Sequence, residues 1–301
     1  MKVVELSGGV GGARMARGLA AVDEVELTVI VNVGDDAENH GLAISPDIDT
    51  VIYTLAGEEG KYGWGRRDDT FHFNEELARF GVDNTFKLGD RDLALKVFRT
   101  NERQRSVPLS KVTESIVASF EIATAVIPAT DDRLRTVVRV DDGWISFQEY
   151  FVARRYRDEV RELRFDGADT AEPAPGVLES ISSADLVVIA PSNPPLSIWP
   201  ILAVSGVRRA VQTHPSVTAV SPLIGGKTVK GPADRILVSL GLPPGNLGVE
   251  MAYDGLIDRF VIDTSDDGEL TSREGLEILA TDTLITDPSA AERLAREITA
   301  T

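Results

Sequence analysis

The stretch Val3-Val4-Glu5-Leu6-Ser7-Gly8-Gly9-Val10-Gly11-Gly12, close to the start of the chain, decides the fold class. Its first part is a short apolar run, which predicts a buried strand. Its second part is a glycine-rich loop, and a helical pattern begins near Ala13. A strand, a glycine-rich turn and a helix in this order are typical of the first unit of a doubly wound α/β fold.

Similar apolar runs follow along the chain, and most of them end in polar or glycine-rich loops. Continuous Val and Ile runs are typical of strands buried on both faces, as in parallel sheets. Helical patterns lie between most of them, so we predict an α/β fold that is Rossmann-like and doubly wound. Its sheet should be mainly parallel, with inserted helical and β-hairpin elements. Ligands bind beyond the carboxyl ends of such strands. The further predicted strands are Leu27–Val31, Thr124–Ile127, Leu186–Ile189, Val217–Val220 and Phe260–Ile262.

The middle of the chain has a different pattern. We predict that residues 1–57 and 176–301 form the Rossmann-like core. Residues 58–175 should add inserted helices, a core strand and a β-hairpin around the active-site cleft. Asp142-Gly143 favours the hairpin turn. The predicted elements are helices over Phe73–Arg79, Asp92–Thr100 and Leu109–Val117, and hairpin strands over Arg135–Val140 and Trp144–Phe151.

Arginines concentrate around the predicted hairpin, which is the only basic region of the sequence. They form either an exposed hairpin face or an anion-binding surface, and the sequence leaves both interpretations open. The members of this arginine cluster are Arg133, Arg135, Arg139, Arg154, Arg155 and Arg157.

The overall charge limits the partners of the protein. The 301 residues include 31 basic and 48 acidic side chains, for a net charge of −17. This charge argues against nucleic acid and anionic membranes as partners. No apolar run approaches the ~20 residues of a membrane span, and the N-terminus starts in a strand pattern rather than a signal peptide. We therefore expect a cytoplasmic protein. With 24 Arg but 7 Lys, the acidic composition suits a salt-rich cytoplasm, where screening removes self-repulsion.

The residue types available restrict the chemistry. The chain has no cysteine, which excludes disulfides, zinc–thiolate sites, iron–sulfur clusters and cysteine nucleophiles. Its three histidines, His40, His72 and His214, include no pair at the i, i+4 spacing of a helical zinc site. A metal ion would therefore use carboxylates, which hard cations such as Mg²⁺ or Mn²⁺ prefer.

Three aspartates are candidate catalytic and metal-ligating residues. Asp35 and Asp36 follow the strand predicted over Leu27–Val31. At a carboxyl edge they can bind a metal ion or polarise a hydroxyl, or they belong to a solvated loop. The third is Asp49, which lies in the first turn of a predicted helix. The apolar stripe of that helix should face the core, so we expect Asp49 on the exposed side of the first turn.

The start of that helix has an ordinary structural explanation. Ser45 suits the N-cap, Pro46 the first helical position, and Asp47 the positive end of the helix dipole. None of these roles applies to Asp49. Its carboxylate is therefore the one in this segment that we assign to the site.

Glycine loops and rare polar residues predict a phosphate site. Amides at a glycine-rich turn and a helix N-terminus bind anions, although a tight structural turn remains the alternative. The dinucleotide fingerprint fails because Arg14 stands where the third glycine should be, and no Gly-Lys-Ser/Thr motif follows. The candidate phosphate- or nucleotide-binding residues are Gly8, Gly9, Gly11, Gly12, Ser192, Asn193 and Lys230.

Taken in order, these motifs resemble the 2-phospho-L-lactate transferase family, whose members act in the biosynthesis of the deazaflavin coenzyme F-420. The resemblance extends over nearly the whole chain. It rests on SGGVGGAR (Ser7–Arg14), NVGDD (Asn32–Asp36), SPDIDTVIYTLAG (Ser45–Gly57), GWG (Gly63–Gly65), DDTF (Asp68–Phe71), KLGDRDLAL (Lys87–Leu95), FQEYFV (Phe147–Val152), PAPGVLE (Pro173–Glu179), PSNP (Pro191–Pro194), SI-P-IL (Ser197–Leu202) and SPLIGG with KGPAD (Ser221–Asp234).

The resemblance implies a reaction as well as a fold. It implies a Rossmann-like core, dependence on Mg²⁺ (or Mn²⁺) and a homodimer. The donor would be a guanosine diphosphate-linked lactate or its enolpyruvyl counterpart. The acceptor would be Fo, a 5-deazaflavin with a ribityl chain, and GMP would be released. By similarity, Asp49 and Lys87 match positions that contact Fo.

Two other classes of protein remain as alternatives. A related family with the same core contains non-catalytic regulators that bind nucleotide sugars, but the blocks Asn32–Leu42 and Gly63–Phe71 favour the transferase. An NAD(P)-dependent oxidoreductase is the second alternative. The broken glycine fingerprint speaks against it, and so does Asn32, which lies near the place of the ribose-binding acid.

Overall fold

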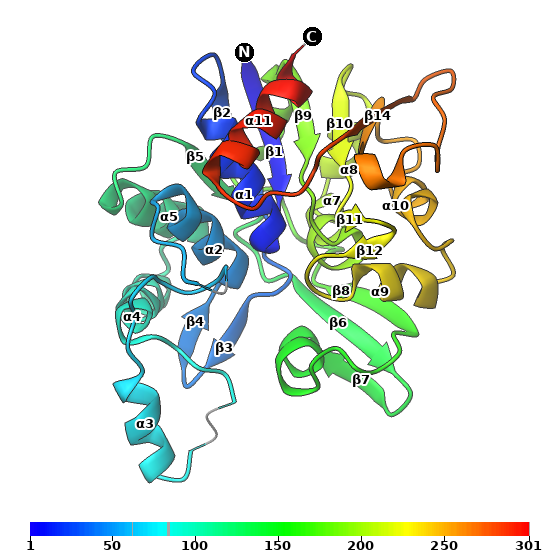
Figure 1. Cartoon of the computed structure of the whole chain (residues 1–301). Coiled ribbons are helices and arrows are strands. Elements are labelled where there is room, and N and C mark those ends of the chain that lie inside the picture. The colour runs from blue at the N-terminus through cyan, green and yellow to red at the C-terminus, as the bar shows by residue number, and fades with distance from the viewer. Residues whose placement is uncertain (62, 83–84, 301) are drawn as a thin grey trace.

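A computed structural model describes residues 1–61, 63–82 and 85–300 (Figure 1). Its centre is a parallel sheet of seven strands in the order β14-β13-β10-β9-β1-β2-β5. The predicted α/β class is therefore confirmed. The strands are β1 (Lys2–Ser7), β2 (Glu26–Val31), β5 (Ala125–Pro128), β9 (Leu186–Ile189), β10 (Val217–Val220), β13 (Arg259–Asp263) and β14 (Glu277–Thr281).

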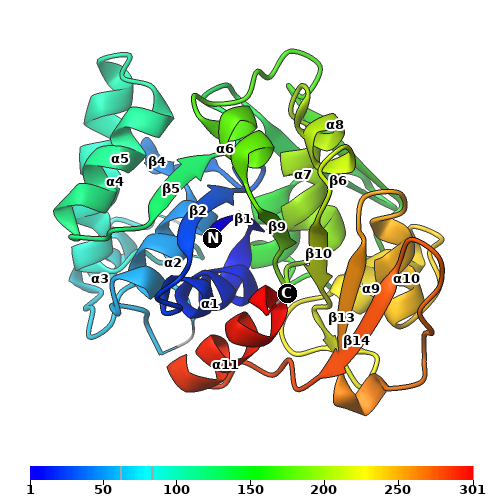
Figure 2. The same ribbon diagram turned by 90° about the horizontal axis from the view of Figure 1, so that it is seen from above.

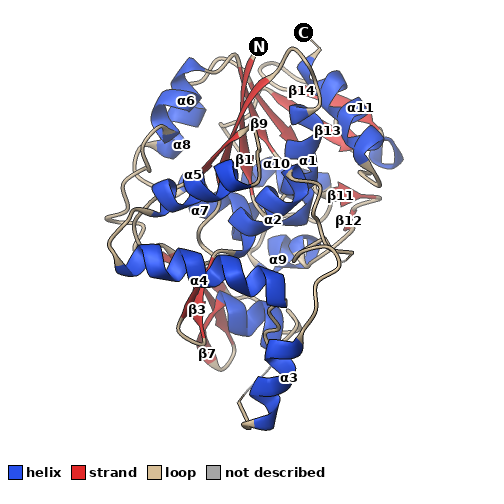
Figure 3. Cartoon of the chain, turned by 90° about the vertical axis from the view of Figure 1, so that its left-hand side faces the viewer, coloured by secondary structure: helices blue, strands red, loops and turns tan. Residues whose placement is uncertain are grey.

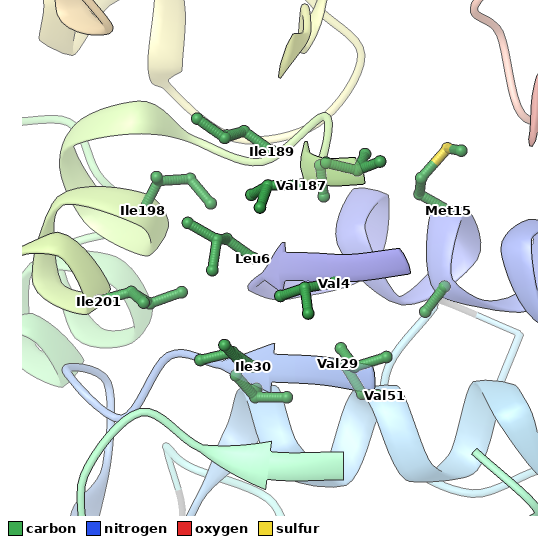
Figure 4. Packing of buried hydrophobic residues seen from close by; sticks show 14 of the residues in the cluster. Val4, Leu6, Met15, Val29, Ile30, Val51, Val187, Ile189, Ile198 and Ile201 are labelled. Atoms are coloured by element: carbon green, nitrogen blue, oxygen red, sulfur yellow. The ribbon is translucent and has the colours of Figure 1, made fainter. Parts of the chain in front are cut away.

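The central strands are largely apolar because helices cover both faces of the sheet and bury most side chains of these strands. Figure 4 shows Leu6, Ile30 and Val187 from three adjacent strands packed into one core. All three side chains are fully buried. Within this seven-stranded sheet, β14 is the strand that the sequence did not predict, and it is an edge strand whose residues are at most partly buried. It therefore lacks the continuous Val and Ile run that marks the other strands.

Figure 2 shows the two helical layers. Helices α1, α2 and α11 cover one face of the sheet, and α6, α7 and α8 cover the other. Gly18 lets α1 and α11 touch, because a Cβ there would lie 2.3 Å from the carbonyl oxygen of Ala291. The bounds are α1 (Gly9–Ala20), α2 (Pro46–Leu55), α6 (Val177–Ser183), α7 (Trp199–Leu202), α8 (Val207–Gln212) and α11 (Pro288–Thr299).

Two groups of additional elements lie beyond the carboxyl ends of the strands (Figure 1). One group contains the hairpin β3–β4 and the helices α3 and α4, whereas α5 packs beside the edge strand β5. Figure 3 shows α4 running below α5 and α3 projecting from the body. The second group is an antiparallel sheet in the order β7-β6-β8. The bounds are β3 (Ala37–Asn39), β4 (Leu42–Ile44), α3 (His72–Arg79), α4 (Asp90–Gln104), α5 (Leu109–Ser119), β6 (Arg135–Val140), β7 (Gly143–Ser146) and β8 (Glu162–Asp166).

The predicted helices of the insertion are present, and α4 extends beyond both of its predicted ends. The predicted second hairpin strand is wrong beyond Ser146, because the chain turns there into a short π-helix. The third strand, β8, was not predicted. The remaining elements are η1 (Glu149–Ala153), η2 (Pro194–Ile198), β11 (Leu223–Ile224), β12 (Lys227–Thr228), α9 (Ala233–Ser239), α10 (Asn246–Ala252) and η3 (Thr264–Asp266).

The division into core and insertion stays a prediction, and one strand shows how the two are joined. β5 belongs to the segment 58–175, yet it pairs in parallel with β2 at the edge of the main sheet. Among the described helices, none is long and apolar enough to cross a membrane.

Candidate functional site

Asn32 lies at the centre of the candidate site, directly after β2. Its side chain is fully buried. Its amide nitrogen donates to Asp47 Oδ2 at 2.9 Å and to Asp35 Oδ1 at 3.2 Å. Its Oδ1 accepts the N–H of Gly34 at 2.7 Å. One amide therefore holds two carboxylates together at the carboxyl edge of the sheet.

The glycine-rich loop forms the start of α1, which begins at Gly9 rather than near Ala13 as predicted. Gly9 has φ +65°, a conformation that favours glycine. Its N–H donates to Asp47 Oδ1 at 2.9 Å. The next two amides, of Val10 and Gly11, have no acceptor within the helix, because the first turn of any helix lacks them. The start of α1 is therefore beside the carboxylates and still offers amides to a ligand.

Gly11 and Gly12 have a steric role that the sequence did not reveal. A Cβ on Gly11 would lie 2.2 Å from the carbonyl oxygen of Pro191, and one on Gly12 would lie 2.4 Å from Ser7 Oγ. The loop after β9 thus presses against the start of α1. Gly9 has open space at its Cβ position, so its positive φ rather than a neighbouring atom favours glycine there.

Three carboxylates here are buried without a cationic ion-pair partner among the described residues: Asp35, Asp36 and Asp47. Burial raises the pKa of Asp36 to about 7, although Arg135 and the Ser45 hydroxyl oppose the shift. Burial also raises the pKa of Asp47 to about 6. For Asp35, burial and the charge of Asp47 hold the pKa well above its ordinary value. These groups repel one another in the absence of a positive charge.

Asp36 has one oxygen with a partner and one without. Its Oδ2 accepts the Ser45 hydroxyl at 2.9 Å, while its buried Oδ1 has no hydrogen-bond partner in the described structure. Ser45 is at the N-cap of α2 as predicted, but its side chain does not cap the helix. The hydroxyl turns to the site instead.

Asp49 is buried, contrary to the prediction of an exposed position; only 3% of it is accessible. Helix α4 covers this side of α2, and two of its cations hold the carboxylate. Lys96 Nζ donates to Oδ2, and Arg99 donates to both oxygens. Burial would raise the pKa of Asp49, but Arg99 and Lys96 outweigh burial and hold it below its ordinary value. Asp49 is therefore an ionised anchor between α2 and α4.

Asp47 is the site residue that the sequence analysis missed. It suits the helix dipole, so we gave it no further role. In the structure it contacts both Gly9 and Asn32, and a Cβ on Gly8 would lie 2.7 Å from its Oδ2. The sequence does show two carboxylates in the segment Asp47-Ile48-Asp49. Only the position of α4, which pairs with Asp49, distinguishes the anchor from the residue of the site.

Comparison with known proteins identifies the family. The family model described as 2-phospho-L-lactate transferase CofD matches residues 3–298. The chain belongs to this family. It is similar to the phosphoenolpyruvate transferase of Streptomyces griseus, with 43% identity over 99% of this chain and 97% of the relative. It is also similar to the 2-phospho-L-lactate transferase of Methanopyrus kandleri, with 42% identity over 99% of this chain and 96% of the relative.

The family membership confirms the resemblance and makes the protein a transferase, which decides against the regulator and the oxidoreductase. A solved structure of a UPF0052 family member from Bacillus halodurans is similar in fold. It has a TM-score of 0.65 and 16% identity, and the match covers 99% of both chains. At that identity the likeness supports the fold alone.

The other residues predicted to bind substrate in this transferase lie in the loop after β9, before α4 and before α9. Ser192 Oγ donates to the Gly8 carbonyl at 2.7 Å, and Asn193 Oδ1 accepts the N–H of Leu196 at 3.2 Å. Both therefore stabilise the loop after β9. Lys87 is exposed just before α4. Burial lowers the pKa of Lys230, and the positive charge of Arg14 on α1 adds to the effect. The roles proposed for these residues stay predictions.

The residues around Asn32 fit a hard divalent cation, although no group of three or more carboxylates or imidazoles within 1–61, 63–82 and 85–300 is already arranged as a metal cluster. The fit rests on the mutual repulsion of the buried carboxylates Asp35 and Asp47, beside which Asp36 has an unpartnered oxygen. Oxygen ligands of this kind suit Mg²⁺ or Mn²⁺. Asp49 fits less well, because Lys96 and Arg99 already neutralise it.

Proposed function

We propose that this transferase moves a phosphate-linked three-carbon acid from a guanosine diphosphate-linked donor to the ribityl hydroxyl of Fo, in coenzyme F-420 biosynthesis. The named relatives support the transferred group, since one is a phosphoenolpyruvate transferase and one a 2-phospho-L-lactate transferase. Because their identities to this chain differ by so little, lactyl and enolpyruvyl donors are both candidates. The donor nucleotide and the acceptor come from the family resemblance.

The observation that most supports this proposal is the contact between the start of α1 and the carboxylates around Asn32. Free amides at a helix start bind phosphate, and carboxylates beside them suit a proton acceptor or a metal ion that neutralises phosphate charge. Gly9 and Asp47 are joined by a single hydrogen bond of 2.9 Å. A diphosphate at α1 would therefore lie next to the groups that the chemistry needs.

The reaction forms one bond and breaks one. The ribityl oxygen attacks the phosphorus that bears the three-carbon acid, and the bond from this phosphorus to the bridging oxygen breaks. GMP leaves with that oxygen, and the product is a phosphodiester. The hydroxyl proton passes to a carboxylate, for which we propose Asp36, because a pKa of about 7 suits a base near neutral pH.

The remaining residues hold and orient the substrates. Amides of Val10 and Gly11, with Lys230, would bind the diphosphate. A divalent cation held by Asp35 and Asp47 would supply charge neutralisation at the phosphates and leave Asp36 free to accept the proton. The ion pairs of Asp49 with α4 would fix the side of the site that faces Lys87 and the acceptor. Positioning and electrostatics are the main contributions that such a displacement requires.

GMP release tests the proposal. We expect GMP to form only when Fo and a guanosine diphosphate-linked donor are both present. We also expect exhaustive chelation to abolish GMP formation and Mg²⁺ or Mn²⁺ to restore it, as measured by chromatography of the nucleotides. Full activity after chelation would contradict the metal role, whereas GMP formation without Fo would contradict the acceptor.

A further inference from the structure

The structure divides the arginine cluster into two kinds. Arg139 pairs with Glu162 at 3.1 Å, and Arg154 pairs with Asp142 and Glu149 at 3.0 and 2.7 Å. These arginines hold the small sheet β7-β6-β8 and η1 together. In the described part of the chain, Arg133, Arg135, Arg155 and Arg157 form no ion pair, and of these Arg133 and Arg135 lie just before and at the start of β6. Neutralisation inside this sheet therefore does not explain them.

Arg135 lies at the candidate site rather than on the outer part of the hairpin. It is the first residue of β6, and its Nη1 donates to the carbonyl oxygens of Leu134 at 2.6 Å and Val33 at 3.4 Å. The next residue fixes the same contact, since the N–H of Thr136 donates to the Gly34 carbonyl at 2.8 Å. The start of β6 is thus held against the loop that contains Asp35 and Asp36.

The surroundings of Arg135 have an excess of positive charge. Arg135 is partly buried, and no partner is recorded for its Nη2 or Nε among the described residues. Burial lowers its pKa; Asp36 opposes this shift, whereas the positive charges of Arg133 and Arg103 add to it. The guanidinium groups of Arg133 and Arg103 therefore lie close enough to Arg135 to repel it, and Asp36 is the carboxylate that opposes them. A further anion would relieve their repulsion.

We propose that Arg135, with Arg133 beside it, binds the carboxylate of the three-carbon acid in the donor. The inference rests on the proposed function. The donor has two phosphates and one carboxylate. In the proposed function, the start of α1 and Lys230 bind the phosphates, which leaves the carboxylate without an assigned partner. Arg135 donates to Val33, and Gly9 is linked through Asp47 to the neighbouring Asn32, so a donor bound at the start of α1 would meet the loop that Arg135 contacts. The planar guanidinium matches a carboxylate through two parallel hydrogen bonds.

Calorimetric titration without Fo tests this assignment, because the donor then has no acceptor. The donor and GDP are each titrated, with Mg²⁺ present, into the wild type, Arg135→Gln, Arg135→Lys and the matched control Arg139→Gln. We expect Arg135→Gln to weaken donor binding by about 10- to 100-fold, the effect of losing a charge-assisted hydrogen-bonded pair. GDP binding should change by less than about threefold, since a typical surface substitution has an effect of that size. Arg139→Gln should change neither.

Each other outcome has a definite meaning. Unchanged donor binding in Arg135→Gln overturns the inference, and equal weakening of donor and GDP assigns Arg135 to phosphate and overturns the carboxylate role. A folded wild type that binds no donor overturns both the inference and the proposed function. If Arg135→Gln does not fold, Arg135→Lys decides. It keeps the charge but loses the planar fork, so donor binding should weaken several-fold with GDP binding intact; equal binding to the wild type overturns the inference.

Discussion

Asp49→Asn is expected to lower the free energy of unfolding by about 3–5 kcal/mol, the usual effect of removing one partner from a buried ion pair. The variant leaves Arg99 fully buried and without its carboxylate, whereas Lys96 keeps Asp92 at 2.6 Å. Most of the loss should therefore come from Arg99. Denaturant unfolding at pH 7 measures the effect.

Asp47→Asn is the matched control for this experiment. Asp47 is as buried as Asp49, but its partners are the N–H of Gly9 and the amide of Asn32 rather than cations. Its pKa is raised to about 6 by burial, so removing its charge should leave stability unchanged or slightly higher at pH 7. A change of less than about 1 kcal/mol in Asp49→Asn, within the range of surface substitutions, would contradict the anchoring role of Asp49.

Asp36→Asn is expected to reduce turnover by about 100- to 10 000-fold, the contribution of a positioned general base. An amide cannot accept the hydroxyl proton. In the wild type, kcat/KM should rise with pH until Asp36 is ionised, because the base must be ionised and burial raises its pKa, to about 7 in the metal-free protein. GMP formation measured from pH 5.5 to 8.5 would show this rise.

The same substitution should stabilise the metal-free protein at high pH. The folded-state pKa of Asp36, about 7, lies above the ordinary value of an aspartate, so the folded state binds a proton more tightly than the unfolded state does. The contribution of Asp36 to stability is then full below the unfolded pKa and is lost as pH rises through about 7. Thermal midpoints with chelator present should fall less steeply between pH 5 and 8 in Asp36→Asn. A steeper fall, or turnover above a tenth of wild type, would contradict this role.

The sheet was predictable because parallel strands are buried on both faces. Runs such as Leu186–Ile189 are apolar throughout, as expected for a short strand that is buried on both faces. The edge strand β14 was not predicted because its residues are at most partly buried, so its sequence lacks a continuous apolar run. The strand-end position of Asp35 and Asp36 was predictable for the same reason, since the carboxyl ends of parallel strands meet at one edge.

The roles of Asp47 and Asp49 were not predictable from local sequence. The apolar stripe of α2 shows which face packs on the sheet, but it does not show that α4 covers another face. That information depends on Lys96 and Arg99, which lie 47 and 50 residues further along the chain. The start of α1 was misplaced for a related reason, because part of the steric need for Gly11 and Gly12 comes from the distant residues Pro191 and Ser192.

The most direct test of the proposed transfer is mass spectrometry of the product. The purified protein is incubated with Fo, Mg²⁺ and one donor at a time, the lactyl or the enolpyruvyl compound. We predict a product with the mass of Fo joined to the three-carbon acid through one phosphodiester, formed together with an equal amount of GMP, for at least one donor. Unchanged Fo with both donors, in a folded preparation that binds guanine nucleotide, would contradict the account.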